Sequence, residues 1–165
     1  MKFLIVSDTH GMTEDFIRVF YAFKDQVDYF IHCGDVGFST LECNELEQFI
    51  TVEGNCDAGN YPVVETIQKA GSKHNILITH GHLLDVKWNL NRLYYKALEQ
   101  DAKVVCFGHT HQPLYNRIND VVLINPGSLF ANRGVRGKTF AILTLDNDHI
   151  NVTHYNAETF TPYTL

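Results

Sequence analysis

Residues 103–111 read KVVCFGHTH, a short apolar run that is followed at once by two histidines, His109 and His111. Four other short apolar runs end in the same way, on carboxylate, amide or imidazole side chains. They are FLIVS before Asp8-Thr9-His10, YFIHC before Gly34-Asp35, FITVE before Gly54-Asn55-Cys56-Asp57 and NILIT before His80-Gly81-His82. Such runs predict buried strands, and the carboxyl ends of strands are where α/β proteins place ligands. We therefore expect these side chains to gather at one edge of a sheet.

The composition is that of one globular domain, which we expect to span residues 1–165. Apolar residues make up 45% of the chain and charged residues 19%, which is not the composition of a disordered chain. The formal net charge is −6. This acidity disfavours a nucleic-acid partner that is held mainly through phosphate contacts.

The sequence also predicts a cytoplasmic protein without a membrane partner. No apolar stretch approaches the roughly 20 residues that span a bilayer, and the apolar run after Lys2 is too short for a signal peptide. The four cysteines are not arranged in CxxC pairs, so we expect free thiols in a reducing compartment. The 8 tyrosines and 11 phenylalanines leave a homo-oligomer open, because a dimer patch and core packing explain them equally well.

The first half of the chain alternates strand and helix patterns. Strands are predicted at 2–6, 28–33, 49–52, 61–68, 75–79 and 103–107, with a hairpin turn at Ala70-Gly71-Ser72. A helix is predicted after a cap at Thr13-Glu14-Asp15, with an apolar face of Phe16, Val19, Phe20 and Phe23. Further helices are predicted at 40–48 and 85–100.

The second half predicts strands without helices, at 114–118, 121–124, 139–145 and 149–155. Asn-Asp, Pro-Gly and Asp-Asn-Asp turns separate them, which indicates a β-meander. The simplest assembly of both halves is an α/β fold, a four-layer α/β/β/α sandwich of two mixed β-sheets flanked by helices.

Seven side chains at the strand ends are candidate metal ligands: Asp8, His10, Asp35, Asn55, His80, His109 and His111. Taken alone, Asp8, His10, Asp35 or Asn55 is explained as well by a cap, a turn or the surface. Three imidazoles at strand ends are hard to explain by packing. Asp8 and His10 are two residues apart, a spacing that directs both side chains to one side of a strand.

We assign the ligands to two cations, with Asp35 as the bridge because a carboxylate has two oxygens. One cation takes Asp8, His10, Asp35 and His111, and the other takes Asp35, Asn55, His80 and His109. Such ligands suit Mn²⁺, our first choice, or Ni²⁺, Fe²⁺, Co²⁺ or Zn²⁺. Two cations about 3.5–4 Å apart can bind one hydroxide and clamp the attacking and leaving oxygens. The pattern therefore predicts a two-metal hydrolase.

Other residues have expected roles around this centre. We expect Asp35, Asn55, His109 and Asp57 to take part in catalysis, with Asp57 holding the tautomer of His10 through its free ring N–H. His82 either replaces His80 as a ligand or stands beside the substrate. His32 lies inside a strand and is expected to be a hydrogen-bonded core residue, whereas His74, His149 and His154 are expected at the surface.

The order of the motifs resembles the calcineurin-like metallophosphoesterase superfamily: D-x-H at residues 8–10, GD at 34–35, GN-x-D at 54–57, HG at 80–81 and GHTH at 108–111. The resemblance covers residues 8–128, including Asn125-Pro126-Gly127-Ser128. The segments GNCD, THGH and GHTH are most similar to those of the small prokaryotic phosphodiesterase branch. The retromer subunit of the eukaryotic endosome shares the fold of this branch. The resemblance implies this fold, a two-metal site and phosphoesterase activity.

One position departs from the superfamily pattern. Many members carry a histidine after the motif asparagine, and that histidine can help the leaving group or hold the phosphate. This chain has Cys56 there, as the small phosphodiesterase branch does, and a thiol with a pKa near 8.5 is a poorer proton donor. We therefore expect esters with good leaving groups, or water as the source of the proton, and leave open whether Cys56 or His82 transfers a proton.

The expected function is a metal-dependent phosphodiesterase that cleaves a P–O ester of a small phosphodiester by in-line attack of a metal-bridging hydroxide. A non-catalytic protein-interaction scaffold on the same fold is one alternative, which the retention of every imidazole ligand disfavours. A metal-dependent nuclease is the other, which the net charge of −6 disfavours. Loops around 37–43, 60–62 and 132–136 are expected to shape the pocket, where Arg133 and Arg136 either bind a distal phosphate or are solvated.

Overall fold

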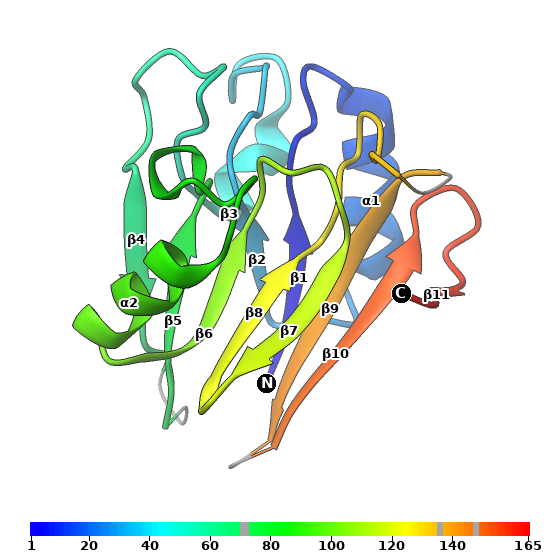
Figure 1. Cartoon of the computed structure of the whole chain (residues 1–165). Helices are drawn as coiled ribbons and strands as arrows, with labels where there is room; N and C mark the ends of the chain where they lie inside the picture. The colour runs from blue at the N-terminus through cyan, green and yellow to red at the C-terminus, as the bar shows by residue number, and fades with distance from the viewer. Residues whose placement is uncertain (70–72, 135–136, 147–148) are drawn as a thin grey trace.

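Two mixed β-sheets pack face to face in the computed structural model (Figure 1), which describes residues 1–69, 73–134, 137–146 and 149–165. The six-stranded sheet has the order β11 (Pro162–Tyr163), β10 (His149–Asn156), β9 (Thr139–Asp146), β1 (Lys2–Val6), β2 (Tyr29–His32) and β3 (Phe49–Thr51). The five-stranded sheet has the order β4 (Val64–Ile67), β5 (Asn75–Thr79), β6 (Ala102–Phe107), β8 (Val121–Asn125) and β7 (Leu114–Ile118). The predicted pair of mixed sheets is confirmed.

Alternating side chains divide the apolar core into layers. Along β1, Phe3 and Ile5 are buried in a cluster to which both sheets contribute, whereas Leu4 and Val6 are buried with Phe16 of α1 (Thr13–Phe23). The five-stranded sheet divides in the same way between the shared cluster and α2 (Asn91–Glu99). The two-residue period of a strand thus gives each sheet one face for the other sheet and one for a helix, which confirms the four-layer sandwich.

Helix α1 forms where the apolar spacing predicts it, but it is capped differently. Phe16, Val19, Phe20 and Phe23 are buried, as predicted. The expected cap at residues 13–15 is wrong, because Met12 is the N-cap residue without a side-chain hydrogen bond and Thr13 is already helical. The acidic side chains of the first turn stabilise the helix instead through its positive N-terminal end.

The other predicted helices are shorter than their sequence patterns. Within the segment 40–48 the only helix is a short 3₁₀ helix, η1 (Asn44–Gln48). Between β5 and α2 the chain forms the 3₁₀ helix η2 (His82–Leu84) and turns, so α2 starts later than predicted. Asp85 adopts a left-handed φ of 55°, and its carbonyl accepts the N–H groups of Trp88 and Asn89. This turn delays the helix until Asn91. The strand predicted from residue 61 likewise begins only at Val64.

The predicted β-meander of the second half is wrong, because its strands are shared between the two sheets. β7 and β8 pair with each other beside β6, while β9 pairs with β1 of the other sheet, Phe3 opposite Leu143. β11 is an additional short strand that pairs with β10. The predicted turn at 70–72 and the residues 147–148 of the Asp-Asn-Asp turn lie outside the described residues. None of the helices that the structure describes is both long enough and apolar enough to cross a membrane.

Strands β1, β2 and β3 run parallel, as do β5, β6 and β8. A buried histidine fixes the loops that follow two of them. The N–H of Gly34 donates to Nδ1 of His32 (3.2 Å), so the neutral ring carries its proton on Nε2, which lies 3.0 Å from Oγ1 of Thr9. Thr9 in turn donates to the carbonyl of Val36 (2.7 Å). The prediction of a hydrogen-bonded core histidine is confirmed, and the chain of bonds ties the loop after β1 to the loop after β2.

His154 was expected at the surface, and this expectation is wrong. Its ring is buried, and Nε2 lies 2.8 Å from the carbonyl oxygen of Asn125. The bond links β10 of one sheet to the end of β8 of the other. The alternation of apolar and polar residues along β10 does not reveal this hydrogen bond, because the acceptor belongs to the other sheet.

Protonation of His32 is expected to destabilise the fold. Burial lowers its pKa from about 6.5 to about 4, so between these values the unfolded chain binds the proton and the folded chain does not. The contribution of His32 is therefore complete above pH 6.5 and is lost as the pH falls to 4, in total about 3 kcal/mol. Urea unfolding with a chelator at pH 7.5, 6 and 5 will measure it, and His32→Asn should unfold with a shallower pH dependence. Equal slopes for both proteins would contradict this assignment.

Candidate metal centre

Five of the candidate ligands have a left-handed backbone conformation that residues other than glycine rarely adopt. Asp8, His10, Asp35, His109 and His111 have φ values between 44° and 68°. Left-handed residues of this kind cost about 1–3 kcal/mol each and cluster at functional sites. All five lie in the loops directly after β1, β2 and β6. The local backbone thus turns the side chains back over the strand ends.

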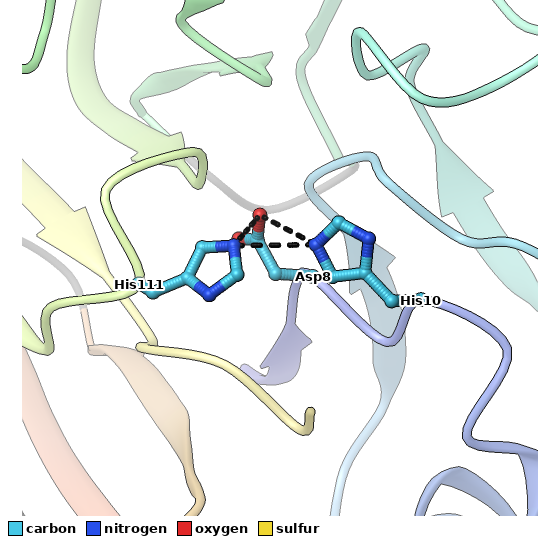
Figure 2. A group of neighbouring side chains, drawn as sticks. All are labelled: Asp8, His10 and His111. Carbon is cyan, nitrogen blue, oxygen red and sulfur yellow. Dashed lines mark hydrogen bonds and ion pairs between the residues drawn. The ribbon is translucent and has the colours of Figure 1, made fainter. Parts of the chain in front are cut away.

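Asp8 presents one unsatisfied oxygen to this cluster. Its Oδ2 accepts the Ser7 hydroxyl (2.6 Å) and the main-chain N–H of His109 (3.1 Å). Its Oδ1 is buried and accepts no hydrogen bond from the described part of the chain. Figure 2 shows this carboxylate between two rings, with Oδ1 at 3.0 Å from Nε2 of His111 and 3.9 Å from Nε2 of His10. A buried carboxylate oxygen left without a donor is costly unless a cation neutralises it.

His80 and His111 both turn Nε2 toward the same space. Nδ1 of His80 lies 2.7 Å from the carbonyl of Cys33, and Nδ1 of His111 lies 2.9 Å from the carbonyl of Ala131. A carbonyl only accepts hydrogen bonds, so both Nδ1 atoms carry a proton and both Nε2 atoms face the site. Although burial opposes it, the neighbouring carboxylates raise the pKa of His80, and the hydrogen bond to Asp8 raises that of His111. A cation bound here would therefore displace a proton from these rings. Backbone carbonyls behind ligating histidines are the usual arrangement in metal sites.

Four imidazoles lie in two pairs, and both Asp8 and Asp35 approach a ring of each pair. Oδ1 of Asp8 lies 3.9 Å from Nε2 of His10 and 3.9 Å from Nε2 of His80. Nε2 atoms of His10 and His111 lie 3.2 Å apart beside Asp8, and Nδ1 of His109 lies 3.2 Å from Nε2 of His80. Oδ2 of Asp35 stands between the pairs, 3.6 Å from Nε2 of His10 and 3.3 Å from Nε2 of His80. This is the place that a carboxylate bridging two cations would occupy.

Asn55 belongs to the same cavity, which has a volume of about 350 Å³. Its lining is formed by His10, Asp35, Asn55, Cys56, Lys87, His109, His111, Phe130 and Arg133. Cys56 also borders a neighbouring cavity of about 550 Å³ formed by residues of the predicted pocket loops, among them Phe38, Ser39, Asn60 and Tyr61. His82 stands beside the ligands, its ring 5.5 Å from that of His80. His80 reaches the carboxylates, so the geometry favours His80 as the ligand.

Mutual interactions set the charge states of the ligands. Burial opposes the ionisation of Asp35, yet the hydrogen bond and charge of His80 hold the pKa of Asp35 below its ordinary value. Burial, the charge of His80 and the charge of Lys87 lower the pKa of His109 to about 4. An ionised carboxylate and a neutral imidazole are the forms that bind cations.

The expected contact between Asp57 and His10 is wrong. Oδ2 of Asp57 accepts the main-chain N–H groups of Asp35 (2.9 Å) and Gly54 (2.8 Å). Oδ1 accepts those of Val36 (2.8 Å) and Gly37 (3.4 Å). Asp57 therefore joins the loop after β2 to the loop after β3. Gly54 makes this possible, because a Cβ there would lie 2.1 Å from Oδ1 of Asp35.

Sequence reasoning missed several residues that support the site. The hydroxyl of Ser128 donates to the carbonyl of Asp8 (2.9 Å) and accepts the N–H groups of Phe130 and Ala131 (3.0 Å each). Nδ2 of Asn125 donates to the carbonyl of Gly108 (2.8 Å). The signal was the segment Asn125-Pro126-Gly127-Ser128, which was noted for its resemblance without a structural role. Lys87, which carried no motif, also borders the cavity.

Fold and site together define a metal-binding α/β/β/α protein. The chain belongs to the calcineurin-like phosphoesterase superfamily, whose domain model matches residues 1–148. It is 42% identical over 159 residues to the probable metallophosphoesterase YsnB of Bacillus subtilis (strain 168), covering 94% of this chain and 91% of that protein. It is 28% identical over 180 residues to the phosphodiesterase YfcE of Escherichia coli (strain K12), covering 94% and 93%.

Solved structures show the same fold. A conserved protein of Streptococcus pneumoniae TIGR4, described as a predicted phosphoesterase, superposes with a TM-score of 0.88 at 27% identity, covering 98% of this chain and 92% of that chain. Vacuolar Protein Sorting 29 of Cryptosporidium parvum superposes with a TM-score of 0.77 at 17% identity, covering 98% and 94%. The latter likeness concerns the fold alone.

Asp57→Asn is expected to weaken both the fold and the metal site. The amide can accept at one atom only and turns its NH₂ group toward main-chain donors, so about 3 kcal/mol of the free energy of unfolding should be lost. Urea unfolding of the metal-free protein and calorimetric titration with Mn²⁺ will measure the two effects. Asp28→Asn is the matched control, because Asp28 is an acceptor for a single exposed N–H, that of Lys2. Unchanged stability and Mn²⁺ affinity in Asp57→Asn would refute the positioning role.

Proposed function

We propose that this metallophosphoesterase is a phosphodiesterase that hydrolyses a small phosphodiester at a centre of two divalent cations, by in-line attack of hydroxide on phosphorus. The observation that carries the proposal is the position of Asp35, whose Oδ2 lies within 3.6 Å of a ligand nitrogen from each pair of imidazoles. The name of the relative YfcE supports the choice of a diester.

The residues present fit two cations. Asp8, His10, Asp35 and His111 would hold one, and Asp35, Asn55, His80 and His109 the other. The unsatisfied Oδ1 of Asp8 lies nearest to Nε2 of His111, a ligand of the first. Bound cations supply Lewis-acid charge and an acidified water as nucleophile. Carboxylate, amide and imidazole ligands support Mn²⁺ first, with Ni²⁺, Fe²⁺, Co²⁺ or Zn²⁺ as alternatives.

The chain itself orients the reacting groups. The main-chain N–H of Cys56 donates to Oδ1 of Asp35 (2.8 Å), and Oδ2 is the oxygen that faces the imidazoles of His10 and His80. Asn55 and His109 line the cavity where the phosphoryl oxygens would lie. Burial and the charge of Asp35 raise the pKa of the Cys56 thiol. A thiol that holds its proton so firmly is a weak acid for a departing alkoxide, which favours esters with good leaving groups.

The alternatives are less well supported. A scaffold has no need of four clustered imidazoles, and this chain keeps all of them. His10, His80 and His111 lie against carboxylate or carbonyl oxygens, and His109 lies against the ring of His80. A nuclease must attract a long polyanion against a net charge of −6. The four free cysteines support a cytoplasmic location.

Metal-stripped protein is expected to regain hydrolysis of bis-p-nitrophenyl phosphate when Mn²⁺ is added. Hydrolysis of p-nitrophenyl phosphate should remain slow, because the proposed substrate is a diester, as the name of the relative YfcE supports. Release of nitrophenolate measures both reactions. Failure of Mn²⁺, Ni²⁺, Co²⁺ and Zn²⁺ alike to restore diester cleavage would favour the scaffold alternative.

Asp35→Asn is expected to abolish the shared ligand while retaining the fold, and diester hydrolysis should fall by about 10³-fold or more. Metal content after dialysis against Mn²⁺ should fall below two ions per chain. Asp25→Asn, a change of the same charge at an exposed position outside the cavity, serves as the control. Wild-type metal content and turnover in Asp35→Asn would show that the bridge is assigned to the wrong residue.

A further inference from the structure

The cavity over the metal ligands carries two cationic side chains that the ligand assignment does not use. Lys87 and Arg133 both line this cavity and are both exposed. Neither has an ion-pair partner among the described residues. The same is true of Lys2, Lys24, Lys69 and Arg117, but these four do not line the cavity. Five other cationic side chains pair with carboxylates: Arg18, Arg92, Lys96, Lys103 and Lys138. In a chain with 19 acidic and 13 basic residues, two unpaired cations in the same cavity require an explanation.

The two side chains belong to opposite groups of ligands. The main-chain N–H of Arg133 donates to the carbonyl of His111 (2.8 Å), which fixes Arg133 beside the group of Asp8, His10 and His111. Lys87 lies in the segment between η2 and α2, and its charge acts on His109 of the other group. A ligand that reaches both Lys87 and Arg133 therefore lies in the same cavity as the candidate metal ligands.

Formal charges show that a simple diester would leave these cations without a counterion. Two divalent cations bring four positive charges, and Asp8 and Asp35 cancel two of them. The attacking hydroxide and a phosphodiester each bring one negative charge, so the centre with its scissile group is neutral. Lys87 and Arg133 then remain as two positive charges at the mouth of the cavity, where bound substrate displaces the water that solvates them.

We propose that Lys87 and Arg133 bind a second phosphate group of the substrate, so that the substrate is a small phosphodiester that also carries a phosphomonoester. This inference rests on the proposed function and names its substrate class. A phosphomonoester has a charge of about −1.5 to −2 at pH 7, which matches two cations. The guanidinium of Arg133 can bind two of its oxygens in parallel, and the ammonium of Lys87 supplies a point charge.

The test compares two substrates that differ by one phosphate: the p-nitrophenyl ester of thymidine 5′-phosphate, and the same ester with a 3′-phosphate. Wild-type protein with Mn²⁺ should cleave the 3′-phosphorylated ester with a kcat/KM at least about tenfold higher. Lys87→Met and Arg133→Gln should each reduce this preference, and the double variant should reduce the ratio to about one. Added salt should also reduce the wild-type preference, because the contacts are exposed.

Control variants carry the same charge changes away from the cavity. Lys24→Met and Arg117→Gln remove exposed cations that do not line it, and both should keep the wild-type preference. The inference is overturned if wild-type protein treats the two esters alike, or if the double variant keeps the preference. It is also overturned if the controls lose the preference as fully as the cavity variants, since the effect would then be one of net charge.

A binding measurement separates this inference from the proposed function. Calorimetric titration with thymidine 3′,5′-bisphosphate and with thymidine 5′-monophosphate needs no turnover. Wild-type protein should bind the bisphosphate about tenfold more tightly, and the double variant should bind both alike. If neither ester is cleaved but this difference is found, the phosphodiesterase proposal fails and the anion site stands. If cleavage occurs without a difference in binding or kcat/KM, the anion site fails and the phosphodiesterase stands.

Discussion

The carboxylate of Asp57 is the constraint on which the geometry of the centre depends. It accepts main-chain N–H groups from residues 35–37 and from Gly54, and so holds the ends of β2 and β3 in one relation. Asp35 and Asn55 lie within these two loops, so both candidate ligands are positioned by the same half-buried carboxylate. A charged acceptor satisfied by several amides is among the stronger interactions available to a protein. The ligands are thus placed by backbone, and they need no contact with one another.

This arrangement destabilises the fold when no cation is bound, and a bound cation would offset that cost. Two buried carboxylates, Asp8 and Asp35, lie around the same imidazole nitrogens, and Oδ1 of Asp8 has no donor among the described residues. Left-handed backbone at five ligands adds to the cost. A cation that binds only the folded chain repays these terms and stabilises it by mass action. The hydrogen bonds of His32 and Ser128 hold the loops in position for this, because they fix the backbone on either side of Asp8.

The sequence was sufficient to predict most of the strands and a set of candidate ligands that the structure brings together, because both are local signals. A short apolar run followed by Asp or His identifies β1, β2, β5 and β6 and the residues that follow them. The role of Asp57 was not accessible, since a carboxylate that accepts amides and one that orients a histidine have the same sequence. The prediction of a β-meander was wrong for a related reason. Nothing in the apolar pattern of β9 indicates that this strand pairs with β1 and not with β8. The start of α2 depends on the turn at Asp85, which the apolar spacing of Leu90, Leu93 and Ala97 conceals.

Electrostatics resolve the contrast between an acidic chain and an anionic substrate. The net charge of −6 acts on any ligand at long range, where it disfavours a polyanion that must lie along the surface. Inside the cavity the balance is reversed, because the carboxylates are committed to the metal centre and the side chains at its mouth are Lys87 and Arg133. A small anion samples mainly this local field, since other charges are screened beyond about 8–10 Å at ordinary ionic strength. This distribution of charge therefore supports the proposal of a small phosphoester substrate over one of a nucleic acid.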